Sequence, residues 1–382
     1  MSEVMETIRA AYEREKAARR APRTATDIPF DYDAITDEWL TAVLCRRHPA
    51  AHVTGHRLDQ VDSGTSNRRR IFVEYDAAGR DAGLPPSVFC KATHDLLTRV
   101  FLGSAGSIVS KTTFYNRVRP LLAIEAPRCH VASYDAETFN SIVMLDDLAL
   151  EGAAFCSHRT AVTKTHAESL VDLLAALHGR FFESPDLALV EHLGTLTAFF
   201  RRVATLDLER SCGEGFVEAA DAIPARLRGR AAEVWPATVR AFELHEQLPR
   251  TLQHGDVHLK NWYLTRDGRM GLGDWQAMTI GHWSRDVAYA LSTALTVENR
   301  RAWERDLLHR YLERFEAAGG PRIAFDEGWL RYRQQMPSAL AWWTITLTPN
   351  ANFPDMQPRD LTVEFIRRIA HALDDLESLD AL

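Results

Sequence analysis

The sequence predicts an α+β protein of two lobes, with an antiparallel sheet in the N-terminal lobe and mostly helices in a larger C-terminal lobe. Three observations lead to this prediction. Strand-like runs recur in the first part of the chain, at 70–75, 86–92 and 142–145. Beyond residue 148 the apolar side chains follow helical spacing instead, as at Leu170, Leu173, Leu174 and Leu177. The chain of 382 residues is long enough for two such lobes.

The composition is that of a globular protein without a strongly basic surface. Lys and Arg total 45 against 52 Asp and Glu, a net charge of −7, which argues against a nucleic-acid partner because phosphate backbones need a positive surface. No apolar run reaches the length that spans a membrane, so no membrane partner is expected. The five cysteines are scattered without CxxC pairing, which predicts reduced thiols and a cytoplasmic protein.

The first 35 residues form a separate segment. Residues 1–20 are charged and helix-prone, and a linker with arginines and a proline leads from there to Pro29. This arm is expected to pack either on the body of the protein or on a second subunit, which leaves a homodimer open. A helix is predicted from Asp37 to about Arg47, with Thr36 or Asp37 as its N-cap. It opens an N-terminal lobe over 36–147, and a C-terminal lobe follows over 148–382.

The C-terminal lobe is predicted to be helical except around residues 251–274. Helical patterns run over 164–178, 187–209, 216–229, 232–246, 299–317, 327–346 and 358–376, and a further helix begins at Trp283. Thr251-Leu252-Gln253 has the character of a short strand. The polar residues that follow this strand therefore stand between two helical regions.

These polar residues are His254-Gly255-Asp256-Val257-His258-Leu259-Lys260-Asn261, followed thirteen residues later by Asp274. Two short strands, 262–264 and 270–272, lie between them around an Asp-Gly turn. Such a hairpin brings Asn261 and Asp274 to one end of a two-stranded ribbon. An amide oxygen and a carboxylate at that end are suitable ligands for a Mg²⁺ ion that also binds phosphates. Asp256 lies on the loop that enters the ribbon, placed to take a proton from a hydroxyl attacking phosphorus. The other interpretation is an ordinary hairpin with polar ends.

The pattern resembles the catalytic signature of the protein-kinase-like phosphotransferases, His-x-Asp-x-x-x-x-Asn followed by a strand pair and an Asp. Its local form HGDVHLKN…DWQ is similar to the aminoglycoside phosphotransferase and choline kinase branch, and most similar to the ecdysteroid-kinase-like members. The protein-kinase strings HRD and DFG are missing, and no Ala-Pro-Glu follows Asp274. The resemblance covers about residues 37–350. It implies a two-lobed protein-kinase-like fold that uses ATP, Mg²⁺ and a small-molecule hydroxyl acceptor.

Roles for individual residues follow from the same resemblance. It implies that Asp256 is the catalytic base, and that Asn261 and Asp274 are the metal ligands. It also implies that Asp286 ties the following helix to the catalytic loop, and His254 is expected to support that loop through backbone contacts.

The resemblance further implies a nucleotide site in the N-terminal lobe. Lys91 follows an apolar run, where a buried ammonium group needs an anionic partner, and it matches the lysine that binds the α- and β-phosphates. Asp146 and Leu148 match the hinge whose backbone binds adenine, although the Asp146 carboxyl suits a strand-end turn equally well. A small-residue turn, which taken alone is more often only a turn, matches the loop over the phosphates. It consists of Ser63, Gly64, Thr65, Ser66 and Asn67.

One position departs from the family pattern. In the family the strand lysine pairs with a Glu on the following helix, in the string Glu-x-x-Phe-Tyr, but this chain has Lys111 at the Glu position. Its spacing from Phe114 and Tyr115 places Lys111 on an inward stripe, toward Lys91, and no Asp or Glu occurs over 96–124. We expect nucleotide phosphates to lie between the two lysines. The alternative is that Lys111 extends to water.

Together these features predict an ATP- and Mg²⁺-dependent phosphotransferase that moves the γ-phosphoryl group to a hydroxyl of a small molecule. The acceptor stays open, because a net charge of −7 does not show an acidic pocket for a polycation, and a sterol, a sugar or an amino alcohol suits the pattern as well. The altered ion pair supports a second prediction, a catalytically silent nucleotide-binding scaffold. The intact Asp256, Asn261 and Asp274 argue against it.

Overall fold

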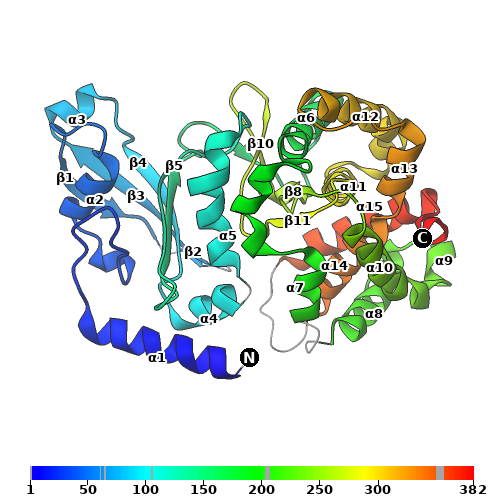
Figure 1. The fold of residues 1–382 in the computed structure, drawn as a ribbon, viewed down its shortest axis with the longest axis horizontal. Helices are drawn as coiled ribbons and strands as arrows, with labels where there is room; N and C mark the ends of the chain where they lie inside the picture. Colours follow the sequence, from blue (N-terminus) through cyan, green and yellow to red (C-terminus); the bar gives the residue numbers. More distant parts are fainter. Residues whose placement is uncertain (1, 61, 64–65, 105, 203–206, 350–356) are drawn as a thin grey trace. The chain divides into compact units, whose positions relative to one another are not determined.

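The computed structural model describes residues 2–60, 62–63, 66–104, 106–202, 207–349 and 357–382. The chain forms two compact units (Figure 1). Unit 1 consists of Met1–Leu121 and Pro127–Ala153, and unit 2 consists of Leu122–Ala126 and Ala154–Leu382. Unit 1 is built on one antiparallel sheet and unit 2 is mostly helical, which confirms the predicted α+β architecture.

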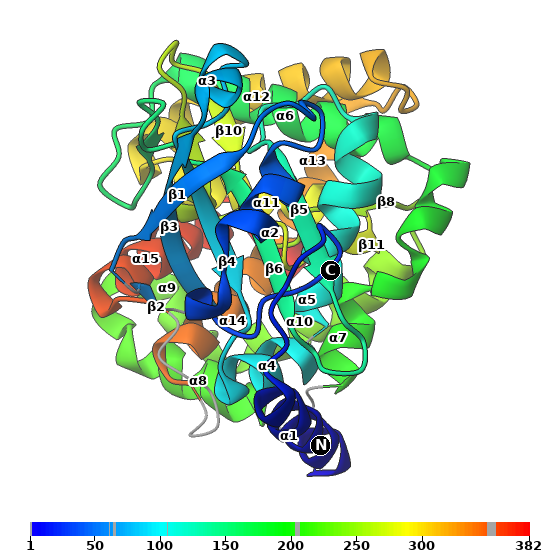
Figure 2. The ribbon, with the colours of Figure 1, turned by 90° about the vertical axis from the view of Figure 1, so that its left-hand side faces the viewer.

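The sheet of unit 1 has the strand order β1-β3-β4-β6-β5, with every neighbouring pair antiparallel and β2 paired to β3. Figure 2 looks onto this sheet. Because side chains alternate along each strand, every strand offers one set of side chains to each face. The strands are β1 (Val53–Leu58), β2 (Asp62–Ser63), β3 (Asn67–Tyr75), β4 (Ser87–Ala92), β5 (Cys129–Tyr134) and β6 (Ser141–Asp146).

Helices cover both faces of this sheet. On one face lies α2 (Asp37–Leu44), whose N-cap Thr36 accepts a hydrogen bond from the Trp39 N–H at 3.1 Å, and which packs on alternate strand residues such as Cys90. The opposite face carries α5 (Ser107–Thr113) and the π-helical turn η2 (Phe114–Val118), as Figures 1 and 2 show. The other helical segments of unit 1 are α1 (Ser2–Ala18), η1 (Tyr32–Ala34), α3 (Ala77–Asp81), α4 (Leu96–Ser104) and η3 (Arg119–Leu121).

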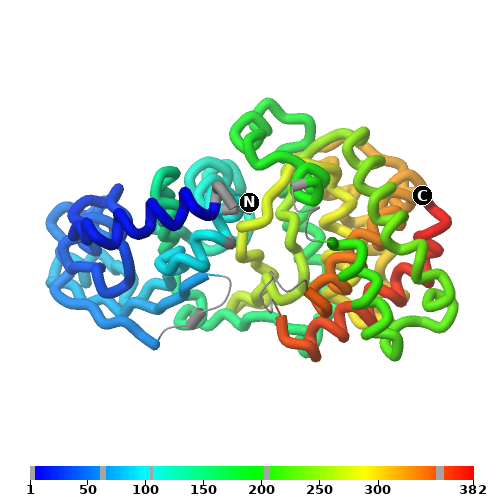
Figure 3. The backbone as a smooth tube through the Cα atoms, turned by 90° about the horizontal axis from the view of Figure 1, so that it is seen from below, coloured from blue at the N-terminus to red at the C-terminus, as the bar shows by residue number. Residues whose placement is uncertain are grey.

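The N-terminal helix α1 packs on unit 1 beside α4. Arg99 of α4 is completely buried and pairs with Glu15 of α1, and Asn140 Nδ2 donates to Glu15 Oε1 at 2.9 Å. Figures 1 and 3 show this helix, in dark blue, on the outer surface of unit 1. The arm thus packs on the body of its own chain, which is one of the two alternatives that the sequence left open.

Unit 2 is organised around α11 (Ser284–Ala294), a helix whose residues are all buried. The helices α6, α12, α13, α14 and α15 pack around it (Figure 1). The helical segments are α6 (Lys164–Phe181), η4 (Pro185–Leu189), η5 (Glu191–Leu193), α7 (Leu196–Arg202), α8 (Leu208–Glu218), η7 (Ala220–Ala222), α9 (Ala225–Arg228), α10 (Ala231–Glu246), η8 (Leu259–Asn261), α12 (Val297–Ala317), α13 (Phe325–Arg333), α14 (Met336–Leu347), α15 (Arg359–Asp375) and η9 (Ser378–Ala381).

Five short strands of unit 2 form two small sheets. One sheet has the order β10-β9-β7, and the other pairs β11 with β8 in antiparallel register. Both sheets lie next to the polar residues singled out in the sequence. The strands are β7 (Ala154–Phe155), β8 (Thr251–Gln253), β9 (Trp262–Leu264), β10 (Met270–Leu272) and β11 (Thr279–Gly281).

Three helices predicted from periodicity are interrupted. The pattern over 216–229 is divided among the end of α8, the 3-10 turn η7 and the short helix α9, which Pro224 precedes. The pattern over 327–346 is split into α13 and α14, because Pro337 in the first turn of α14 lacks the N–H that a continuous helix would use. The pattern over 187–209 begins with two 3-10 turns, the second ending at Gly194 with φ +72, before α7 starts. No helix in the described part of the chain combines the length and apolarity needed to cross a membrane. All five cysteines are free thiols, as their spacing predicted.

Candidate active site

The hairpin predicted from the sequence is present in unit 2. β9 and β10 pair with Gly271 opposite Tyr263, and the Gly273 N–H donates to the Asn261 carbonyl at 2.9 Å, one step beyond the strands. Asp274 follows directly after Gly273. Asn261 and Asp274 therefore lie at the same end of the ribbon, as their spacing predicted.

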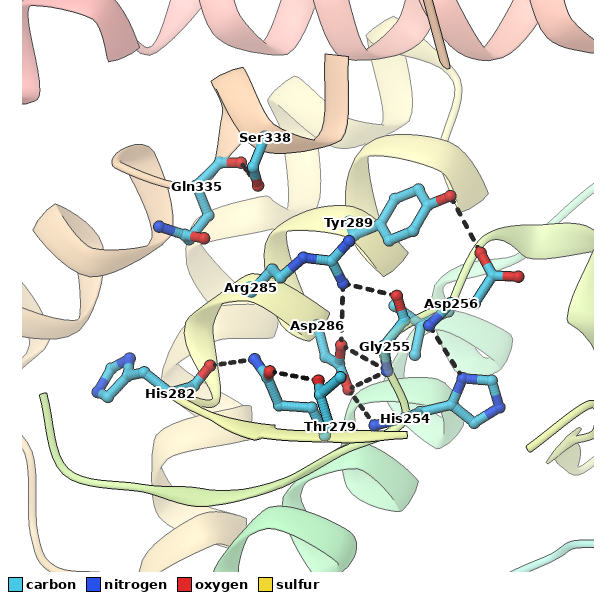
Figure 4. A network of polar contacts seen from close by, with 12 residues as sticks. His254, Gly255, Asp256, Thr279, His282, Arg285, Asp286, Tyr289, Gln335 and Ser338 are labelled. Carbon is cyan, nitrogen blue, oxygen red and sulfur yellow. Dashed lines mark hydrogen bonds and ion pairs between the residues drawn. The ribbon is translucent and has the colours of Figure 1, made fainter. Parts of the chain in front are cut away.

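Two residues at the start of α11 hold the loop that precedes this hairpin (Figure 4). The Asp286 carboxylate accepts hydrogen bonds from the backbone N–H of His254 at 2.7 Å and of Gly255 at 3.2 Å. Arg285 Nη1 donates to the Gly255 carbonyl at 2.6 Å. Both charged side chains are buried, which strengthens these hydrogen bonds and fixes the path of the loop backbone. The expected tie between Asp286 and the loop is confirmed.

Gly255 is required by the path of this loop. Its φ is +82, and a Cβ at this position would lie 2.0 Å from the Ala277 carbonyl oxygen. Any side chain at Gly255 would strain the backbone and displace Ala277. The glycine therefore lets the loop pass close to the segment that follows Asp274.

His254 links the loop to the strand that leads to Asp274. Its Nδ1 accepts a hydrogen bond from the Asp256 N–H at 3.2 Å, so the ring proton lies on Nε2, which donates to the Gly273 carbonyl at 2.9 Å. Burial lowers the pKa of His254 and outweighs the opposing charge of Asp286, so the ring is neutral near pH 7. His254 acts through backbone contacts, as expected.

The Asp256 carboxylate is held by three side chains. Asn261 Nδ2 donates to Oδ2 at 3.1 Å, the Tyr289 hydroxyl donates to Oδ1 at 3.3 Å, and His258 Nε2 lies 3.5 Å from Oδ2. Burial opposes ionisation of Asp256, but the charge and hydrogen bond of His258 outweigh burial, so the pKa of Asp256 lies below its usual value. The side chain is 21% exposed. An ionised, oriented and reachable carboxylate can accept a proton from a substrate.

Asn261 and Asp274 present donor atoms that Mg²⁺ prefers. Asn261 uses its amide nitrogen on the carboxylate and carbonyl of Asp256, so its amide oxygen is directed elsewhere. Asp274 has a left-handed backbone with φ +58, a conformation that costs about 1–3 kcal/mol and is typical of functional sites. One amide oxygen and one carboxylate fit an ion that takes further ligands from phosphates and water. Among the described residues, no group of three or more His, Cys, Asp or Glu side chains has a metal-binding arrangement.

The residues predicted to bind nucleotide lie in unit 1. Lys91 belongs to β4, the middle strand of the sheet. Its neighbours Cys90 and Ala92 belong to the core under α2, so Lys91 points to the opposite face, which α5 covers. On α5, Lys111 is only 7% exposed. Most of the Lys111 side chain is therefore covered, and the position of its ammonium group relative to Lys91 stays a prediction.

The small-residue loop is described only in part. Ser63 and Asn67 pair across β2 and β3, and Ser66 is buried, whereas Gly64 and Thr65 lie outside the described residues. The amide of Asn67 accepts a hydrogen bond from the His94 N–H at 2.8 Å and donates to the Asp95 carboxylate at 2.6 Å. The Asn67 side chain therefore holds the segment that follows β4.

The carboxyl groups of the hinge segment bind other side chains of unit 1. Asp146 accepts a hydrogen bond from His130 Nε2 at 2.8 Å, and the buried Asp147 pairs with Arg70. The Leu148 carbonyl is bonded within a turn, while no hydrogen bond from the Leu148 N–H occurs within the described part of the chain. A ligand at this hinge would therefore meet backbone groups and not the two carboxylates.

Sequence reasoning assigned no role to Arg285, which holds the Gly255 carbonyl, and it missed two residues that contact Asp256. Tyr289 of α11 contacts Asp256. The sequence feature that could have identified it is its position three residues after Asp286 on a predicted helix, which puts both residues on the same side of that helix. His258 lies inside the signature itself, is 3% exposed, and meets the ring of Trp343 edge-on at 5.3 Å. Periodicity gave no reason to choose either residue as a partner of Asp256.

Comparison with known proteins gives the family of the chain. Among solved structures, a candidate aminoglycoside phosphotransferase from Ralstonia eutropha has a TM-score of 0.50 at 12% identity, covering 88% of this chain and 96% of that one. The choline kinase LicA from Streptococcus pneumoniae has a TM-score of 0.46 at 13% identity, covering 89% and 97%. An ethanolamine kinase from Plasmodium vivax has a TM-score of 0.43 at 10% identity, covering 97% and 93%. No curated protein matches the sequence significantly.

The first of these likenesses confirms the predicted protein-kinase-like fold. A family model described as the phosphotransferase enzyme family matches residues 58–333, a range that includes Lys91 and the whole catalytic loop. Because this match spans well over half of the 382 residues, the chain belongs to the phosphotransferase enzyme family.

Proposed function

We propose that this protein transfers the γ-phosphoryl group of ATP to a hydroxyl group of a small molecule. The observation that carries the proposal is the setting of Asp256, an ionised and partly exposed carboxylate on a loop whose backbone is fixed by Asp286 and Arg285. Membership of the phosphotransferase family supports the reaction type. ATP as the donor and Mg²⁺ as the metal are parts of the proposal.

In the proposed reaction Asp256 is the catalytic base. The acceptor hydroxyl gives its proton to the carboxylate while its oxygen bonds to the γ-phosphorus, and the bond from that phosphorus to the β–γ bridging oxygen breaks, releasing ADP. When bound, Mg²⁺ neutralises charge on the β- and γ-phosphates, and the oxygens of Asn261 and Asp274 would hold it. Asn261 serves two purposes, because its nitrogen holds Asp256 while its oxygen is available to the metal. Such catalysis depends mainly on positioning and charge stabilisation.

The nucleotide is assigned to residues of unit 1. Lys91 would bind the α- and β-phosphates, since an ammonium group on a covered sheet face needs an anion. The backbone at Asp146 and Leu148 would bind adenine, supported by the Leu148 N–H at the hinge. The loop over the phosphates would be Ser63, Gly64, Thr65, Ser66 and Asn67. On this proposal residues 36–147 form the nucleotide-binding lobe and 148–382 the catalytic and acceptor-binding lobe, with 1–35 as an N-terminal arm.

The acceptor is proposed to be a small hydroxylated molecule. Within the family, the local form HGDVHLKN…DWQ favours the ecdysteroid-kinase-like branch. The five free cysteines suit a reducing compartment, so we place the protein in the cytoplasm.

A screen of hydroxylated metabolites tests the proposal. ATP consumption is measured with each compound, with and without Mg²⁺, and the product is identified by its gain of one phosphoryl group in mass spectrometry. Asp256→Asn serves as the control, because it should retain nucleotide binding and lose transfer. If the wild-type protein binds ATP but phosphorylates none of a broad set of sterols, sugars and amino alcohols, the proposal is refuted.

That negative result would favour a second function, a nucleotide-binding scaffold without catalysis. The observation that favours it is Lys111, which is buried on α5 at the position where the family has a Glu. The two functions differ in one measurement, since a scaffold binds ATP with the same affinity in wild type and Asp256→Asn and turns it over in neither.

A further inference from the structure

One face of α11 contacts three consecutive residues of the catalytic loop (Figure 4). Asp286 holds the N–H groups of His254 and Gly255, and Arg285 holds the Gly255 carbonyl. Tyr289 follows these two residues by three and four positions, which places it on the same side of the helix. Its hydroxyl lies 3.3 Å from Oδ1 of Asp256. The helix therefore contacts both the backbone of the loop and the carboxylate that the loop carries.

The two oxygens of the Asp256 carboxylate have different surroundings. Oδ2 lies near two donors, Asn261 Nδ2 at 3.1 Å and His258 Nε2 at 3.5 Å. Oδ1 has the Tyr289 hydroxyl, and no second donor to it occurs among the described residues. Because a carboxylate oxygen accepts about two hydrogen bonds, Oδ1 keeps one lone pair that a substrate hydroxyl can use. Oδ1 is therefore the oxygen suited to receive the acceptor proton.

We propose that Tyr289 is a positioning residue that orients Oδ1 of Asp256 toward the hydroxyl of the acceptor. This proposal rests on the proposed function, in which Asp256 is the base. A terminal carboxylate rotates over a broad range unless its oxygens are held. With Oδ2 held by Asn261 and His258, the tyrosine bond to Oδ1 leaves one orientation, with the remaining lone pair of Oδ1 in a fixed direction.

The surroundings of Tyr289 suit this role. The side chain is completely buried, and the Arg285 guanidinium lies 5.3 Å from the centre of its ring. Burial and the charge of Asp256 raise the pKa of Tyr289 well above its usual value, so the hydroxyl keeps its proton and remains a donor. A separation of 3.3 Å is long for an O–H···O bond, and such bonds often shorten when a substrate binds.

Tyr289→Phe tests the proposal, with Tyr332→Phe as a matched control. Tyr332 is equally buried, and its hydroxyl also donates to a carboxylate, Glu304 Oε2, at 3.2 Å, in a place without contact to the catalytic loop. Tyr289→Phe should lower kcat by about ten- to a hundredfold, the effect of one hydrogen bond to a charged group, without changing the KM for ATP. Tyr332→Phe should leave kcat within about twofold of wild type, because the hydroxyl that it removes contacts Glu304 and not the catalytic loop.

A double-mutant cycle separates positioning from general support of the fold. In an Asp256→Ala background there is no carboxylate to orient, so adding Tyr289→Phe should lower the residual single-turnover rate by less than about twofold. An equal loss with and without the carboxylate would overturn the proposal. So would a Tyr289→Phe enzyme with wild-type kcat, or one whose loss matches that of Tyr332→Phe. Absence of transfer by the wild type would overturn the proposed function and this role together, whereas wild-type transfer with unimpaired Tyr289→Phe refutes only the role of Tyr289.

Discussion

Removing the carboxylate of Asp286 should destabilise the protein strongly. In Asp286→Ala the N–H groups of His254 and Gly255, which donate to this carboxylate at 2.7 and 3.2 Å, lose their acceptor in a site without water access. A buried donor left without an acceptor costs about 1–3 kcal/mol, so the two together cost about 2–6 kcal/mol. Because folded proteins are stable by only about 5–15 kcal/mol, this loss should be evident in equilibrium unfolding.

The assay is guanidinium unfolding of wild type, Asp286→Ala, Asp286→Asn and a control, Asp172→Ala. The control also removes an aspartate with two short contacts, since Asp172 accepts from Arg310 Nε and Nη2 at 2.7 Å each, but its side chain is 32% exposed. An exposed pair of this kind should cost less than about 1 kcal/mol. Asp286→Asn keeps one acceptor oxygen and should fall between the two alanine variants. If Asp286→Ala costs no more than Asp172→Ala, the loop is not held by this carboxylate and the reasoning is refuted.

The pH dependence follows from the pKa of Asp286. Burial raises the pKa of Asp286, but the hydrogen bond and charge of His178 and the charge of Arg285 lower it by more, so the folded value lies below the usual one. A carboxyl group with a lowered folded pKa contributes stability above its unfolded pKa of about 3.9 and loses it as the pH falls through the folded value. The difference between wild type and Asp286→Ala should therefore be constant near neutral pH and should shrink below about pH 4. A difference that grows in acid would contradict this.

The remaining predictions concern catalysis, metal and nucleotide. Asp256→Asn should lower kcat by about 10²–10⁴ while ATP affinity, measured by calorimetry, stays near wild type, because the carboxylate takes the proton and does not bind the nucleotide; wild-type turnover would remove Asp256 from the role of base. Asp274→Ala should abolish Mg²⁺-dependent nucleotide binding and Asn261→Ala should weaken it, because each supplies an oxygen ligand; unchanged Mg·ATP affinity in Asp274→Ala would rule out the metal site. Lys111→Glu introduces a carboxylate on α5, the helix that covers the sheet face to which Lys91 points. The substitution should raise the melting temperature of the nucleotide-free protein and weaken ATP binding; the prediction fails if both quantities stay unchanged.

The site elements that the sequence predicted are local in the chain. The β9–β10 hairpin follows from strand residues on either side of an Asp-Gly turn, and thirteen residues suffice to place Asn261 and Asp274 at one end of it. Helical spacing likewise predicts an inward position for Lys111, and this residue is buried, as are most residues of α5. In each case the interactions connect neighbours in sequence, so the pattern of side chains determines the geometry.

The orientation of Asp256 was decided only by tertiary structure. Tyr289 lies 33 positions beyond Asp256, and Arg99 meets Glu15 across 84 positions, so neither pair is implied by the turn or helix that carries its members. Periodicity indicates which side of a helix faces water, but α11 is buried on every side, so exposure to water does not set its rotation. The packing of five helices around α11 fixes that rotation, and with it the direction of Arg285, Asp286 and Tyr289 toward the loop. Before the structure, only the family resemblance, which ties Asp286 to the loop, indicated this rotation. Periodicity alone did not, because the contacts that select the rotation come from the rest of unit 2.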